Sequence, residues 1–270
     1  MPRASVAGAQ ALHGKVDLAA AEFALAVRLA PDNADNHADL ARFKSATGDA
    51  AGAMAEADRA LQLAPRDVNI LTLKGTLVRN ASGPAAALPW FDKALAIDGN
   101  DISALLERGA TLSAVRRNKD MLVDTRRVLS MAKDHPLALY LHAVLAARAG
   151  NYPLAAGIME RTRGALDQGP QALLLQGVVA FQTGSFEQAQ SYLQKLTQMQ
   201  PDNLWARRLY GAAQFRAGDM AGAVKTLRPL ADRPDADALT LSMVGSAFQR
   251  GGQPGVAATY LQRAQQAARL

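Results

Sequence analysis

The residues that could carry acid–base, metal or nucleophilic chemistry are few in this sequence and stand apart. Its histidines are His13, His37, His135 and His142, and none has a partner at the spacing of a metal-ligand pair. The sequence has neither a Gly-x-x-x-x-Gly-Lys-Ser/Thr phosphate loop nor a Gly-x-Ser-x-Gly nucleophile elbow. It contains no cysteine, which excludes disulfides and thiolate metal sites. We therefore predict that the protein is not an enzyme and holds no metal or cofactor.

Side chains that could hold a partner instead recur at a fixed interval in the second half. Arg148, Gln182, Arg216 and Arg250 follow one another with a period of 34. Arginine forms forked hydrogen bonds with carboxylates. The net charge of +6 is also uneven, with +1 in residues 1–135 and +5 in residues 136–270. This excess indicates either a soluble surface or a site for an acidic partner, and both readings stay open.

The same period runs through the whole chain. Ala30-Pro31-Asp32-Asn33 returns as Gln200-Pro201-Asp202-Asn203, which lies five periods further on. Repeats that begin at residues 34, 68, 102, 136, 170, 204 and 238, with one more before them, align the same residue types. Position 8 is small in every repeat: Ala7, Ala41, Gly75, Gly109, Ala143, Gly177, Gly211 and Gly245. Position 20 is Ala in seven of the eight repeats, and position 15 is Gly in six.

These positions have packing reasons. Small residues at positions 8 and 20 let two helices cross closely, and Gly at position 15 can take the positive φ that ends the first helix. Position 24 carries bulk, as in Phe23, Phe91, Met159, Leu193, Leu227 and Leu261, and position 32 often carries a helix breaker such as Pro31 or Pro65. The pattern predicts an all-α chain of eight helical hairpins. The predicted repeats form one array over residues 1–270: 1–33, 34–67, 68–101, 102–135, 136–169, 170–203, 204–237 and 238–270.

This pattern resembles the tetratricopeptide repeat (TPR) over essentially the whole chain. The resemblance implies a right-handed superhelical solenoid in which the first helix of each hairpin lines a concave groove. The fourth repeat departs from the pattern, with Arg116, Met121 and Thr125 at positions 15, 20 and 24, so we expect it to pack less tightly or to bend the superhelix. A base-reading pentatricopeptide array, with a period of 35, is disfavoured because the period of 34 holds without an insertion.

In the TPR family, positions 2, 5, 9, 12 and 13 face the ligand. In repeats five to eight these positions hold the residues that we predict to bind a partner: Tyr140, Arg148, Phe181, Gln182, Trp205, Arg208, Phe215, Arg216 and Arg250. In the first repeats they hold small or polar groups, and the Lys/Asn clamp of chaperone-binding members is absent. Two alternatives stay open: Phe181 and Phe215 belong partly to the core, and the arginines form a solvated edge.

Two functions are consistent with this sequence. The first is a non-enzymatic scaffold in a larger bacterial assembly that binds a protein or peptide segment, acidic in character; nucleic acid is not expected. The second follows from residues 172–184 and 241–252, whose sequences resemble those of the TPR lipoproteins of bacterial exopolysaccharide and PEP-CTERM export systems. That resemblance implies contact with polysaccharide or its secretion machinery. The expected location is the periplasm if the chain comes from an exported parent, and otherwise the cytoplasm. The apolar face of the last hairpin, with Leu261 and Ala264, predicts a longer array or self-association.

Overall fold

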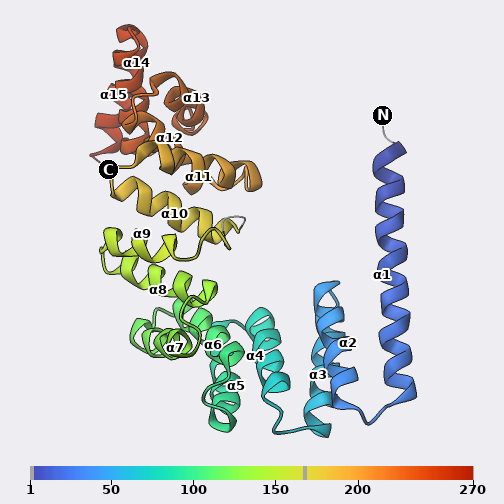
Figure 1. The fold of residues 1–270 in the computed structure, drawn as a ribbon. Coiled ribbons are helices and arrows are strands. Elements are labelled where there is room, and N and C mark those ends of the chain that lie inside the picture. Colours follow the sequence, from blue (N-terminus) through green and yellow to red (C-terminus); the bar gives the residue numbers. More distant parts are fainter. Residues whose placement is uncertain (1–2, 167–168, 270) are drawn as a thin grey trace. The chain divides into compact units, whose positions relative to one another are not determined.

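The structure is a computed structural model that describes residues 3–166 and 169–269, with side chains from residue 16 onward. Every regular element in this part is an α-helix, and from Ala34 onward the hairpins follow one another in the predicted register. The chain divides into two compact units, residues 1–141 and 142–270, which are described separately (Figure 1). The boundary falls inside α8 (Pro136–Arg148).

The first compact unit contains one long helix and three hairpins. Its helices are α1 (Arg3–Leu29), α2 (Ala34–Ala46), α3 (Ala50–Leu63), α4 (Val68–Ser82), α5 (Pro84–Ile97), α6 (Ile102–Ala114) and α7 (Asn118–Met131), followed by the start of α8. The two helices of each hairpin pack on each other, and the second helix of one hairpin packs on the first helix of the next. The first helices α2, α4 and α6 also touch in order.

The second compact unit repeats the same arrangement. After the end of α8 come α9 (Tyr152–Glu160), α10 (Pro170–Gln182), α11 (Phe186–Met199), α12 (Leu204–Arg216), α13 (Met220–Ala231), α14 (Ala238–Arg250) and α15 (Pro254–Ala267). The first helices α10, α12 and α14 contact one another in succession. No helix in the described part of the chain is both long and apolar enough to cross a bilayer.

Local sequence explains why the hairpins form where they do. Gly48 and Gly218 end first helices with φ of 92° and 89°, a conformation that other residues rarely adopt. The carboxylate that follows each glycine caps the second helix: Asp49 accepts a hydrogen bond from the Gly52 amide at 2.8 Å, and Asp219 does the same further along. The prediction of an all-α chain of sequential hairpins is therefore confirmed.

The small residue at position 8 makes room for the bulky residue at position 24 of the same hairpin. A Cβ atom built on Gly211 would lie 2.3 Å from Cγ of Leu227, and one on Gly177 would lie 2.7 Å from Cγ of Leu193. Both leucines are fully buried. The predicted close approach is thus present in these hairpins. Ala7, the first residue in this column, has a side chain outside the described part.

The first repeat differs from the prediction, because Arg3–Leu29 form one helix and not a hairpin. The single helix α1 runs without a break through Gly14, where a turn was expected. The next residue is Lys15, which has no oxygen to cap a new helix, whereas Asp49 and Asp219 cap at the equivalent position of their repeats. The described hairpins therefore begin with the repeat at residue 34.

The fourth repeat departs from the pattern with side chains that are buried. Met121 and Thr125 are 0% and 1% exposed and fill their positions. Arg116 replaces glycine at the turn and takes a φ of 59°. Asp124, only 1% exposed, receives two hydrogen bonds from the Arg108 guanidinium, at 2.9 and 2.6 Å. The residues that depart from the pattern are therefore buried, one as an internal ion pair and one as a large apolar side chain. Looser packing or a bend of the superhelix at this repeat stays a prediction.

Candidate partner-binding site

The predicted binding residues all lie on first helices of hairpins. Tyr140 is on the part of α8 in the first compact unit. The others lie in the second unit: Arg148 on α8, Phe181 and Gln182 on α10, Trp205, Arg208, Phe215 and Arg216 on α12, and Arg250 on α14. Position 13 is the last residue of each of these helices. The negative end of the helix dipole lies there, which is a structural reason for a basic residue at this position.

Two of the arginines lie over aromatic rings. The Arg216 guanidinium carbon is 4.7 Å from the centre of the Phe186 ring, and that of Arg250 is 5.1 Å from the Phe215 ring. Phe186 in turn meets the edge of Phe181, with 5.6 Å between ring centres. Such cation–π contacts contribute about 0.5–1 kcal/mol at exposed sites. We call these five residues, together with Arg148, the arginine surface; both stacked guanidinium groups belong to exposed residues.

The aromatic residues of this surface are partly structural. Phe181 is half-buried and packs against a core cluster that includes Leu193 and Leu196, and Phe215 is also half-buried. Phe186 was not predicted, because position 17 lies outside the family's ligand-facing columns. Its signal in the sequence is an aromatic residue at position 17 followed by an arginine at position 13 of the next repeat.

Arg208 is engaged inside the chain. Its guanidinium lies 3.0 Å from the carboxylate of Asp237, which caps α14 by accepting a hydrogen bond from the Thr240 amide at 2.9 Å. Burial raises the pKa of Asp237, but the hydrogen bonds from Thr240 and the charge of Arg208 outweigh it and hold that pKa below its usual value. Arg208 therefore joins α12 to the start of α14.

Exposed apolar side chains occupy position 2 of the last two repeats. Trp205 on α12 is 51% exposed and Leu239 on α14 is 65% exposed. Because α12 and α14 contact each other, Trp205 and Leu239 lie on neighbouring helices. Leu239 was not among the predicted residues, although it lies in the same column as Trp205. Tryptophan is enriched in binding hot spots because it is large and rigid.

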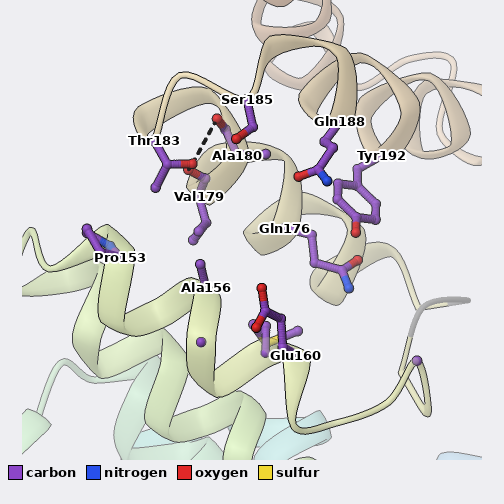
Figure 2. A pocket seen from close by; sticks show the side chains of 13 residues that line it. Pro153, Ala156, Glu160, Gln176, Val179, Ala180, Thr183, Ser185, Gln188 and Tyr192 are labelled. Atoms are coloured by element: carbon purple, nitrogen blue, oxygen red, sulfur yellow. Dashed lines mark hydrogen bonds between the residues drawn. The ribbon is translucent and has the colours of Figure 1, made fainter.

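The pockets described in the structure are lined by other residues. One, of about 580 Å³, lies between α9, α10 and α11 (Figure 2). A second, of about 260 Å³, is lined by groove positions of α2, α4 and α6, including Arg42, Asn69 and Thr76. A third, of about 460 Å³, lies on the last hairpin beside Leu239 and Leu261. Self-association through that hairpin stays a prediction.

In the described part of the chain, no three acidic or histidine side chains gather as potential metal ligands. His37 is 6% exposed and lies between the Glu56 carboxylate, at 2.7 Å, and the carbonyl of Pro31, at 3.0 Å. Its contacts are those of a structural histidine that joins α2 to α3.

Comparison with known proteins agrees with this geometry. The family profile described as "Tetratricopeptide repeat" matches residues 180–242, which run from the end of α10 into α14. This segment therefore matches the TPR family, and it includes the complete hairpin of α12 and α13. No curated protein sequence matches the chain.

Solved TPR structures share the fold over most of the chain. A TPR protein from Parabacteroides merdae has 18% identity and a TM-score of 0.55, covering 87% of this chain and 93% of its own. PilF of Pseudomonas aeruginosa has 15% identity and a TM-score of 0.63, with 73% and 90% covered. PilW, a type IV pilus biogenesis factor, has 20% identity and a TM-score of 0.59, with 74% and 92% covered. At these identities the likeness is one of fold.

Proposed function

We propose that this chain is a non-enzymatic scaffold, part of a larger bacterial assembly, that binds an acidic segment of a partner protein along α10, α12 and α14. The observation that carries the proposal is the arginine surface. There, Arg216 and Arg250 are held over the rings of Phe186 and Phe215 on successive hairpins.

The chemistry of this surface favours an acidic segment that also carries apolar side chains. An arginine whose guanidinium group is already held over a ring loses less conformational freedom when it binds a carboxylate. The exposed Trp205 and Leu239, on the same helices, offer apolar contact area. The excess of basic residues in the second half attracts an acidic segment over a longer range.

Selection from a random-peptide library displayed on phage tests the proposal. The wild-type chain is expected to enrich peptides that combine Asp or Glu with aromatic or aliphatic residues. The triple variant Arg148/Arg216/Arg250→Glu is expected to lose them. The matched control is Lys195/Lys225/Arg269→Glu, which makes the same change of charge at positions outside the arginine surface. Enrichment of the same peptides by the wild type and the first variant would refute the assignment.

The second candidate is a periplasmic component that contacts exported polysaccharide. The observation in its favour is the exposed face of Trp205, since sugars stack on flat aromatic rings. A glycan array separates the two candidates. Binding of acidic polysaccharide that is lost in Trp205→Ala supports this alternative, and an array without signal excludes it for the glycans tested.

A further inference from the structure

The largest of the described pockets lies on a different set of residues from the arginine surface. It is bounded by α9, α10 and the start of α11 and has a volume of about 580 Å³. Figure 2 shows Glu160 from α9, Gln176 from α10 and Tyr192 from α11 pointing toward one end of it. Small and apolar side chains, among them Ala156 and Val179, line the other end.

The repeats of the first compact unit show what occupies the equivalent place there. These three residues stand at position 25 of one repeat and at positions 7 and 23 of the next. In repeats two and three the equivalent residues are Asp58, Lys74 and Trp90. The Lys74 ammonium lies 2.5 Å from the Asp58 carboxylate and 5.7 Å from the centre of the Trp90 ring. Its side chain is only 7% exposed, so the lysine fills the space between carboxylate and ring.

The next repeat uses the same three positions in a related way. Arg108, at position 7, lies 2.7 Å from Asp92 at position 25 and 2.6 Å from Asp124 at position 23. A cation at position 7 therefore joins two hairpins in two successive repeats.

At the pocket this cation is replaced by a shorter, neutral side chain. Gln176 stands where Lys74 and Arg108 stand in their repeats, while Glu160 keeps the acidic group and Tyr192 keeps an aromatic ring. The Glu160 carboxylate makes no ion pair with any described residue. The volume that a long basic side chain fills elsewhere is thus part of the pocket.

The backbone adds to the negative potential at this point. Helix α9 has 9 residues and ends at Glu160, whereas α11 has 14. The negative end of a helix dipole and a carboxylate therefore coincide at the pocket, and both favour a cation. The turn after α9 brings Gly164, with a φ of 78°, to the pocket wall.

We propose that this pocket binds the side chain of a lysine on a partner protein. The ammonium group takes the place of the Lys74 ammonium, between the Glu160 carboxylate and the Tyr192 ring, and the aliphatic stem lies along Val179 and Ala156. Lysine is favoured over arginine because the carboxylate and ring match the surroundings of Lys74, whereas Arg108 lies between two carboxylates. The inference does not depend on the arginine surface.

A nuclear magnetic resonance titration tests the proposal on the isotope-labelled chain. Nα-acetyl-lysine amide is the probe, and Nα-acetyl-norleucine amide, which has a similar stem but no charge, is the comparison. The lysine probe is expected to shift the backbone signals of Glu160, Gln176 and Tyr192, and the norleucine probe is not. n-Butylammonium, which carries the same ammonium group and a similar aliphatic stem, is expected to shift the same signals. Absence of these shifts would contradict the placement of the ammonium and the stem in the pocket.

Two substitutions make the test specific. Glu160→Gln removes the charge and is expected to weaken binding of the lysine probe by about three- to fivefold, the range of an exposed ion pair. Gln176→Lys supplies an internal ammonium, as Lys74 does, and is expected to abolish binding while the rest of the spectrum is retained. The matched control Gln198→Lys adds the same charge at an exposed position of α11 and should bind like the wild type. Undiminished binding by Gln176→Lys, or equal shifts with norleucine, would overturn the proposal.

Discussion

Removal of the Arg108 side chain is expected to destabilise the fourth repeat strongly. Arg108 holds the carboxylate of Asp124 with two hydrogen bonds, and that carboxylate is 1% exposed. The hydrogen bonds that Arg108 donates to Asp124, with a smaller effect from those to Asp92, raise the pKa of Arg108 although burial opposes this. Arg108→Met keeps the length and apolar stem of the side chain but leaves Asp124 as a buried charge without its counter-ion.

The magnitude follows from the burial of the two partners. Breaking a fully buried ion pair costs about 3–5 kcal/mol. The Arg108 side chain is 25% exposed, so water screens part of the effect, and we expect about 2–4 kcal/mol. Asp92, the outer partner, is 58% exposed, so Asp92→Asn is expected to cost less than about 1 kcal/mol.

Hydrogen exchange of the amides in α6 and α7 measures this locally, which suits a repeat fold whose hairpins open separately. A loss of about 2–4 kcal/mol corresponds to exchange faster by about 30- to 1,000-fold. The double variant Arg108→Met/Asp124→Leu removes both charges and should return to within about 1 kcal/mol of the wild type. An acceleration below about tenfold in Arg108→Met, or a double variant as unstable as the single one, would refute the reasoning.

Three further predictions concern stability. Arg116→Gly should raise the free energy of unfolding in urea by about 0.5–1 kcal/mol, because Arg116 has a φ of 59° and glycine adopts this conformation freely. Gly211→Ala should lower the thermal midpoint, because the added Cβ would overlap the buried Leu227 at a cost of about 1–3 kcal/mol, more than the helix propensity of alanine returns. Glu56 is expected to make stability depend on pH. Burial raises the pKa of Glu56, but the hydrogen bonds and charges of Lys44 and His37 outweigh burial, and the pKa lies below its usual value. Its contribution should therefore be present above the ordinary glutamate pKa and be lost as the pH falls through the folded value.

Each of these has a matched control. Gly255→Ala places a Cβ in open space on α15 and should be tolerated, in contrast to Gly211→Ala. Arg117→Gly changes the neighbour of Arg116, which has a negative φ of −79°, and should not stabilise the chain. Glu56→Gln should flatten the acid dependence of unfolding; an unchanged pH profile in that variant would contradict the role assigned to Glu56.

The fold could be predicted in most respects because its determinants are local and repeated. The glycines at position 15, the capping carboxylates after them and the small residues at position 8 act within a single hairpin. The first repeat failed the prediction at Gly14, since a glycine in the right column ends a helix only when the rest of the turn supports it. The fourth repeat carries Met121 where the pattern has alanine, and this larger side chain is fully buried.

The candidate site was predictable in part. The sequence placed Arg216 and Arg250 in one column. It did not show that each arginine lies over an aromatic ring, because that ring comes from the preceding hairpin. It also grouped Arg208 with them, although Arg208 pairs with Asp237 at the start of α14. Column identity shows which helix face a residue occupies, whereas its partners depend on how neighbouring hairpins pack.

The sequence by itself determined the period of 34, the all-α fold and the register of the hairpins from residue 34 onward, because each depends on residues close together along the chain. Only the tertiary structure decided how positions 7, 23 and 25 meet, since they come from three different helices. That meeting is an ion pair at Lys74, a buried network at Arg108 and a pocket at Gln176. The three places differ in the length and charge of the side chain at position 7 and in the residue that it meets at position 23.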